Sequence, residues 1–140
     1  MGAAEPLTVY LPALLAQRIA DGRIATPEEL PAATLFADLS GFTELAEQLA
    51  AAGSAGPERL QEILNVELGR LIACVHRHGG DILKFAGDAI VALWPAHKIG
   101  LTAAVGRACR AGLEIHARRD GLGVRVGVGA GHVIPLAVGE

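Results

Sequence analysis

The stretch TLFADLSGF, residues 34–42, predicts a buried strand that leads directly into a helix. Residues 34–39 are mainly apolar, as in a strand inside a core. The Ser40-Gly41 pair then marks a helix start. We expect Ser40 to be the N-cap, because its hydroxyl can accept an N–H of the first turn. Apolar side chains at positions 42, 45, 46 and 49 continue with helical spacing.

Turn signals elsewhere in the sequence mark the other expected elements. The Gly87-Asp88 pair between two apolar runs is a hairpin signal, and Gly79-Gly80 ends a long amphipathic pattern. In chain order we expect a helix at 8–21, a connector at 23–32, a strand at 34–39, a helix from 42, a loop at 51–56, a helix at 57–78, strands at 81–86 and 89–94, a helix at 99–119, a strand around 124–128 and a further strand beginning within 131–138.

This order of elements predicts an α+β fold, with a ferredoxin-like mixed sheet and helices packed on one face. A chain of 140 residues is about one domain and is long enough to bury a core. We expect residues 1–32 to form an N-terminal helix and connector, and residues 33–140 to form the domain. Right-handed crossovers would place the end of the strand at 34–39 beside the hairpin turn.

The composition excludes several classes of protein. Apolar residues make up 51% and charged residues 19%, which is unlike a disordered chain. The net charge is −3 and the largest basic cluster is Arg118-Arg119, so we expect no binding to nucleic acid or to an anionic membrane. No apolar run approaches the roughly 18 to 20 residues of a membrane span. We expect a soluble cytoplasmic protein with Cys74 and Cys109 as buried free thiols.

Two aspartates stand out as candidate metal ligands. Asp38 ends the first strand and Asp88 lies at the hairpin tip, and the topology brings both to one edge of the sheet. Two carboxylates about 4 Å apart repel by roughly 4 kcal/mol at an effective dielectric of 20. Mg²⁺, which prefers oxygen ligands, would turn that repulsion into attraction, and the backbone carbonyl of Leu39 is a further candidate ligand.

The helix start beside these aspartates is a candidate phosphate site. The N–H groups of Ser40, Gly41, Phe42 and Thr43 open a helix, where free donors and the positive end of the dipole favour an anion. The alternative is that Asp38 is a capping carboxylate and Asp88 an ordinary turn residue. Singly, each residue fits the alternative; together, beside the turn at Gly41, they favour a metal site.

Residues 35–43 (LFADLSGFT) and 80–89 (GDILKFAGDA) closely resemble the two metal motifs of class III nucleotidyl cyclases. The sequence of the second motif is similar to that of the bicarbonate-responsive, soluble adenylyl cyclase branch. Within that branch, the chain resembles the first of the two lobes. The resemblance extends from about residue 30 to residue 140. It implies the class III cyclase fold, incomplete at the C-terminus.

The resemblance also implies a reaction. Two Mg²⁺ or Mn²⁺ ions, bound by Asp38, Asp88 and the Leu39 carbonyl, would promote attack of the ribose 3′-hydroxyl of ATP on the α-phosphate, giving cAMP and pyrophosphate. Lys84 would select adenine in family members with two equivalent sites, or would belong to a bicarbonate site in a first lobe. The third interpretation of Lys84 is a solvated charge on a strand.

The sequence departs from the family after residue 131. Family members continue into a segment whose asparagine and arginine orient the ribose and stabilise the pentavalent phosphate, and these 140 residues contain no such segment. Losing such groups costs on the order of hundreds-fold in rate. We therefore expect an adenylyl cyclase half that needs a second lobe, either another copy or another domain. The alternative is a catalytically silent module that binds nucleotide or a partner lobe.

We expect the remaining polar and aromatic residues to have structural rather than catalytic roles. We expect His76, Arg77 and His78 to serve the C-terminus of their helix, Phe85 and Trp94 to be core residues, and Asp81 to be a turn residue. His97, His116 and His132 share no ligand spacing and are expected to be surface or internally satisfied histidines.

Overall fold

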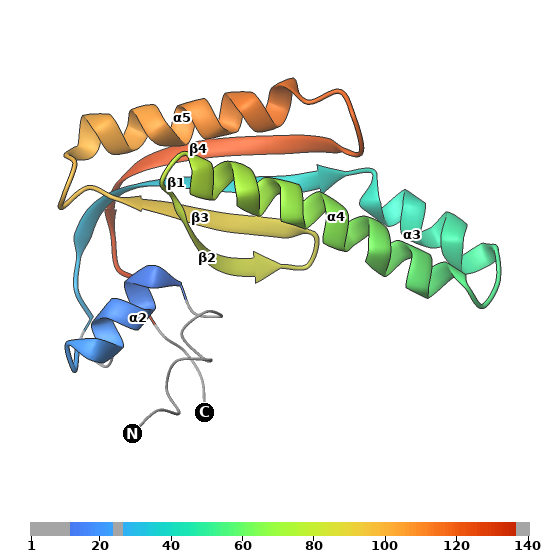
Figure 1. Ribbon diagram of the computed structural model, residues 1–140, viewed down its shortest axis with the longest axis horizontal. Helices are drawn as coiled ribbons and strands as arrows, with labels where there is room; N and C mark the ends of the chain where they lie inside the picture. Colours follow the sequence, from blue (N-terminus) through green and yellow to red (C-terminus); the bar gives the residue numbers. More distant parts are fainter. Residues whose placement is uncertain (1–11, 24–26, 137–140) are drawn as a thin grey trace.

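The computed structural model of the chain describes residues 12–23 and 27–136, which form an α+β fold (Figure 1). The elements in chain order are α2 (Ala13–Ala20), β1 (Leu30–Ser40), α3 (Phe42–Ala51), α4 (Gly56–Arg77), β2 (Asp81–Ala86), β3 (Ala89–Pro95), α5 (Leu101–Ala117) and β4 (Gly123–Val133). The expected hairpin strands and the two long helices are all present, with their ends shifted by at most a few residues.

The four strands form one sheet in the order β2-β3-β1-β4. This is the ferredoxin-like arrangement, which confirms the predicted fold class. Every neighbouring pair is antiparallel, whereas a mixed sheet was expected. The reason is that each helical crossover skips one strand: β3 separates β1 from β2, and β1 separates β3 from β4.

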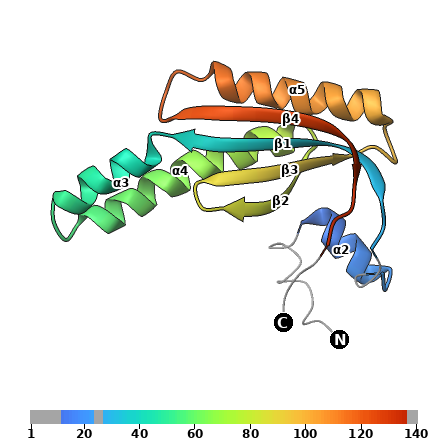
Figure 2. The same cartoon turned by 180° about the vertical axis from the view of Figure 1, so that it is seen from behind.

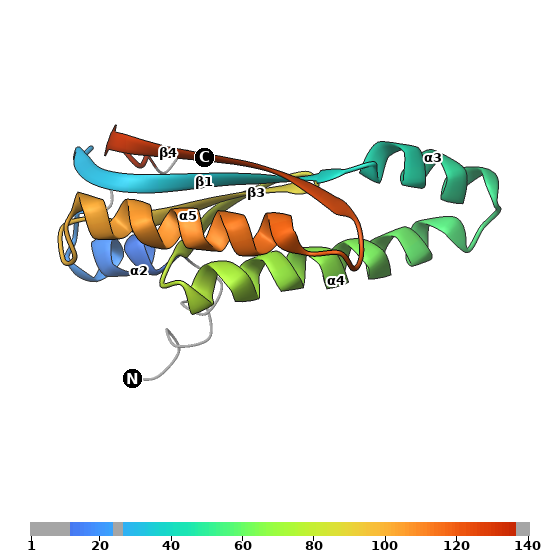
Figure 3. The ribbon, with the colours of Figure 1, turned by 90° about the horizontal axis from the view of Figure 1, so that it is seen from above.

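Helices α4 and α5 cover one face of the sheet, as expected (Figure 3). From behind, the strands lie in front of both helices (Figure 2). We call this second side, which α4 and α5 leave uncovered, the open face. Along β1, Ala33, Leu35, Ala37 and Leu39 point into the core, so Thr34, Phe36 and Asp38 point to the open face.

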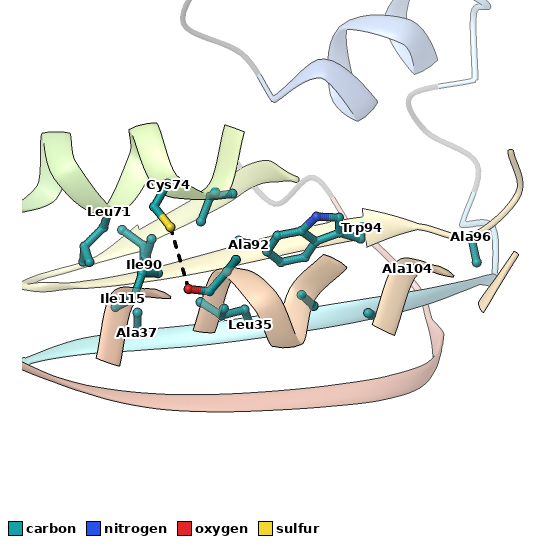
Figure 4. Close-up of a cluster of buried hydrophobic side chains, with 14 of the residues drawn as sticks. Leu35, Ala37, Leu71, Cys74, Ile90, Ala92, Trp94, Ala96, Ala104 and Ile115 are labelled. Carbon is teal, nitrogen blue, oxygen red and sulfur yellow. Dashed lines mark hydrogen bonds between the residues drawn. The ribbon is translucent and has the colours of Figure 1, made fainter. Parts of the chain in front are cut away.

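The core between the sheet and α4 and α5 is built around Trp94 (Figure 4). This side chain is fully buried, and its indole N–H donates a hydrogen bond to the His78 carbonyl at 2.9 Å. A Cβ at Gly80 would lie 2.5 Å from the indole ring, so the chain leaving α4 needs glycine there. The expectation that Trp94 is a core residue is therefore confirmed.

Several element boundaries differ from the sequence predictions. β1 begins at Leu30, inside the expected connector, because a proline near the start of a strand is tolerated. β4 runs unbroken to Val133, where a break and a further strand were expected. α2 begins after Pro12, and residues 8–11 of the expected helix lie outside the described residues. The division of the chain at residue 33 stays a prediction.

The prediction that Ser40 caps α3 is wrong. Ser40 is the last residue of β1 and pairs with Gly123. The N-cap of α3 is Gly41, whose φ of 78° lies in the left-handed region that favours glycine. No side chain makes a capping hydrogen bond there. The strand thus extends one residue further than expected, and Gly41 alone makes the turn.

Two side chains expected in the core are exposed. Phe85 is 54% exposed, because β2 is an edge strand. Cys109 is exposed on α5, whereas Cys74 is buried. Asp81 opens β2 rather than a turn, and its carboxylate accepts the backbone N–H of Leu14 in the first turn of α2 at 3.1 Å. That hydrogen bond attaches α2 to the first residue of the edge strand β2.

A buried ion-pair network joins α4 to the turn between α5 and β4. The Glu67 side chain is 5% exposed and accepts hydrogen bonds from Arg70 and Arg118, each at 3.1 Å. A Cβ at Gly121 would lie 2.3 Å from a Glu67 carboxylate oxygen, so the turn packs directly on this group. The network fixes the point at which the chain enters β4.

Glu67→Ala is expected to lower the free energy of unfolding by about 3 kcal/mol, because it removes the buried carboxylate and leaves the largely buried Arg118 guanidinium with only the exposed Asp120 as a partner. Glu62→Ala is the matched control, since its ion pair with Arg59 is exposed and should change stability by less than about 0.5 kcal/mol. Urea unfolding of the two variants measures the difference. Equal midpoints would show that the Glu67 network does not contribute.

Candidate functional site

The structure places Asp38 and Asp88 side by side at one end of the sheet. Asp38 pairs with Ala89, the residue that follows Asp88, in the β1–β3 ladder. The backbone N–H of Leu39 donates to the Asp88 carbonyl at 3.4 Å. The hairpin turn therefore lies against the end of β1, as the right-handed crossover predicted. The role of the two aspartates as ligands stays a prediction.

The chemistry of this corner fits a hard divalent cation. Both aspartates are half-buried, and neither side chain makes a hydrogen bond or ion pair within the described parts of the chain. Asp38, Asp88 and the backbone carbonyl of Leu39 would offer only oxygen atoms, the ligands that Mg²⁺ and Mn²⁺ prefer. Carboxylates without an ion pair to a described residue are suited to an external cation.

The first turn of α3 lies directly beyond Asp38. Because its N-cap, Gly41, has no side chain to accept a hydrogen bond, the amides of Phe42 and Thr43 have no capping partner. The Leu45 N–H closes the first helical bond, to the Gly41 carbonyl, at 3.1 Å. Of the expected phosphate-binding positions, two therefore lie in the helix, while Ser40 lies in the strand and Gly41 in the turn. A triphosphate beside Asp38 would meet the positive end of the α3 dipole.

Arg125 is a residue of this corner that the sequence analysis missed. It pairs with Asp38 across β1 and β4, so both side chains project from the open face, with Cβ atoms about 5 Å apart. Arg125 is exposed and makes no ion pair with a described residue. The alternation of valines with Arg125 indicates that Arg125 lies on the face of the strand opposite to the valines. Only the register of β1 against β4 shows that it neighbours Asp38.

The open face of β4 carries almost no side chains besides Arg125. The positions that share this face are glycines, facing Ser40, Phe36, Thr34 and Ala32 on β1: Gly123, Gly127, Gly129 and Gly131. Their φ angles are not positive, and a Cβ at Gly127 or Gly131 would meet no heavy atom within 4 Å. Phe36, next to this strip, is 47% exposed. Beyond Arg125, the open face of β4 therefore carries few side chains.

Lys84 is not part of the aspartate corner. It pairs with Val91, which in turn pairs with Phe36, so Lys84 lies two strands across and two residues along from Asp38. With a strand spacing of about 4.8 Å and a rise of about 3.3 Å per residue, that is roughly 12 Å. Lys84 lines a pocket of about 270 Å³ whose other walls include Leu14 and Arg18 of α2.

Comparison with known proteins identifies the family. No protein-family model matches the chain. Human adenylate cyclase type 10 is 39% identical over 116 residues, which cover 76% of this chain and 7% of that protein. The guanylyl cyclase Cya2 superposes with a TM-score of 0.66 at 25% identity, over 81% of this chain and 60% of that one. A bacterial light-regulated adenylyl cyclase superposes with a TM-score of 0.67 at 21% identity, over 96% and 41%.

The chain belongs to the class III nucleotidyl cyclase family. The expected family and the expected cyclase fold are thereby confirmed. This cyclase domain spans less than a tenth of the length of the human relative, and about half of the two solved chains. None of its described helices is both long enough and apolar enough to cross a membrane.

Asp38→Asn is expected to weaken binding of Mn²⁺ by about tenfold or more in the presence of a non-reactive ATP analogue, because it removes a negative ligand. Glu47→Gln on the exposed side of α3 is the matched control and should leave the affinity unchanged. Isothermal titration calorimetry measures both, with circular dichroism to confirm folding. Equal affinity of the two variants would exclude Asp38 as a ligand.

Proposed function

We propose that this chain carries the metal- and triphosphate-binding half of an adenylyl cyclase site, which forms cAMP and pyrophosphate from ATP when a second lobe completes it. The observation that carries the proposal is the meeting of Asp38 and Asp88 beside the first turn of α3. The similarity to adenylate cyclase type 10 favours ATP as the substrate. Within residues 12–23 and 27–136 neither aspartate forms an ion pair, which supports a role for an added cation.

Each residue of the corner has a separate role in this proposal. Asp38 and Asp88, with the Leu39 carbonyl, hold two cations, and the amides of Phe42 and Thr43 hold triphosphate oxygens. Bound Mg²⁺ or Mn²⁺ supplies Lewis-acid activation of the ribose 3′-hydroxyl and neutralises charge on the triphosphate. The β1–β3 ladder and the Leu39–Asp88 hydrogen bond keep the two carboxylates in position before ATP arrives.

The partner in this proposal is a second cyclase lobe, either another copy of the chain or another domain. The open face next to Asp38 is left uncovered by α4 and α5, which gives such a lobe access to a bound nucleotide. In this proposal the second lobe supplies the asparagine and arginine that the family resemblance implies for the transition state. The two free thiols favour the cytoplasm as the compartment.

Mixing the chain with a lobe that contributes this asparagine and arginine is expected to produce cAMP from ATP in Mg²⁺ or Mn²⁺. Asp38→Ala in this chain should abolish turnover, and Glu47→Ala should not change it. Turnover that survives Asp38→Ala would contradict the proposal. Mn²⁺-dependent nucleotide binding without cAMP in any pairing would instead establish the alternative, a silent cyclase-like regulatory module.

Lys84→Ala separates the two proposed roles of this lysine in the same paired assay. If Lys84 contacts the base, the ratio of kcat/KM for ATP to that for GTP falls, because a donor to an adenine ring nitrogen is lost. If Lys84 binds bicarbonate in the pocket that it shares with Arg18, the ratio stays and stimulation by bicarbonate disappears. A variant that matches the parent in both measurements would leave Lys84 as a solvated strand charge.

A further inference from the structure

A second group of metal-binding side chains lies on the helical side of the molecule, away from the aspartate corner. Cys74 lies in the last turn of α4 and His78, four residues later, is its C-cap, so both lie on one side of the helix end. Glu114 reaches them from α5. One ligand atom from each of the three residues lies within 4.8 Å of the other two. No other such group of three occurs within residues 12–23 and 27–136.

The contacts within this cluster already orient its members. Nε2 of His78 lies 2.7 Å from Oε2 of Glu114. The guanidinium of Arg77 contacts Oε1, the other oxygen of the same carboxylate. The Cys74 thiol donates to the Ala111 carbonyl at 3.7 Å, an interaction drawn as the dashed line in Figure 4. Arg77 lies in the last turn of α4 and His78 is its C-cap, as expected, and both side chains also bind across to Glu114 on α5.

Burial decreases across the cluster from the thiol to the carboxylate. Cys74 is 3% exposed, the His78 side chain 20% and the Glu114 side chain 43%. An ion could therefore approach through the carboxylate and imidazole and meet the thiol last. The donations from His78 and Arg77 lower the pKa of Glu114, so its carboxylate is ionised at neutral pH.

We propose that Cys74, His78 and Glu114 form a binding site for Zn²⁺, with water as the fourth ligand. One sulfur, one imidazole nitrogen and one carboxylate oxygen are the three ligand types that zinc accepts together, whereas Mg²⁺ and Ca²⁺ avoid sulfur. Three protein ligands and one open position make a tetrahedral site. The site is independent of the proposed cyclase function, because it shares no residue with the aspartate corner.

The geometry requires only small shifts of side chains. Tetrahedral zinc holds its ligand atoms roughly 3.4 to 3.6 Å apart. Nε2 of His78 and Oε2 of Glu114 would exchange their hydrogen bond for two bonds to the ion. The sulfur, which lies within 4.8 Å of both, would approach them by at most about an ångström. Arg77 would stay on Oε1 and fix the orientation of the carboxylate.

Binding would exchange one proton for the ion. Burial, followed by the negative charge of Glu114, raises the pKa of the Cys74 thiol, so the metal-free protein keeps the proton on sulfur. On binding, the S–H bond breaks, the Zn–S bond forms and the thiol proton leaves to solvent. The neutral His78 imidazole moves its proton from Nε2 to Nδ1, which frees the Nε2 lone pair for the ion. The ion would then connect the end of α4 to α5, one residue before the glycines that lead into β2.

The test is a zinc titration of the purified, reduced chain in competition with a chromophoric chelator. We expect one ion per chain, and a loss of affinity of about tenfold or more in Cys74→Ser, His78→Gln and Glu114→Gln. The matched controls are His76→Gln, an exposed histidine in the same turn, and Cys109→Ser, the exposed cysteine. Both controls, and Asp38→Asn, should bind zinc as tightly as the parent chain.

Substitution of Co²⁺ provides a second readout that identifies the ligands. A thiolate-to-cobalt charge-transfer band is expected in the parent chain and in Cys109→Ser, and should be absent in Cys74→Ser. Should Cys74→Ser fail to fold by circular dichroism, the variants of the less buried His78 and Glu114 decide. Zinc binding that follows Cys109 or Asp38, survives both His78→Gln and Glu114→Gln, or is absent from the parent chain would overturn the proposal.

Discussion

The central position of β1 is the constraint on which the rest of the structure depends. It pairs along its length with β4 on one side and, over most of it, with β3 on the other. Every second side chain is thereby buried under α4 and α5, and the residues between them face the open side. A shift of one residue would exchange these two sets, which makes the register strongly determined. Asp38 is held in place by the burial of Ala37 and Leu39 on either side of it.

Much of the fold follows from local signals in the sequence. The hairpin at 81–86 and 89–95 was predictable because a Gly-Asp turn separates two apolar runs, and α4 because its apolar stripe ends at a glycine pair. The N-cap of α3 was not, because Ser40 and Gly41 are both acceptable caps until the length of β1 is known. Phe85 and Cys109 illustrate a further limit: whether an apolar side chain is covered depends on which strand or helix lies next to it.

In the candidate sites, too, some residues were predictable from local sequence and others depend on how distant elements pair or pack. Asp38 and Asp88 were recognisable from their strand contexts, and the hairpin's place in the topology predicted that they would lie together. Arg125 was not recognisable as their neighbour, because a cross-strand pair is defined by register and not by spacing along the chain. The His78–Glu114 contact spans 36 residues and depends on how α4 docks against α5. A pattern confined to one helix gives no indication of such a pair.

The glycine strip along β4 affects how that strand is stabilised. Glycine in a strand loses more backbone entropy on ordering than any other residue and offers no side chain for cross-strand packing. The glycines of β4 therefore weaken the preference for an extended conformation that its valines provide over these 11 residues. Its order comes from neighbours: the ladder with β1, and Val124 and Val126, which pack against the core. The order of β4 thus depends on its contacts with β1 and α5. The position of the Arg125 guanidinium depends on the same contacts.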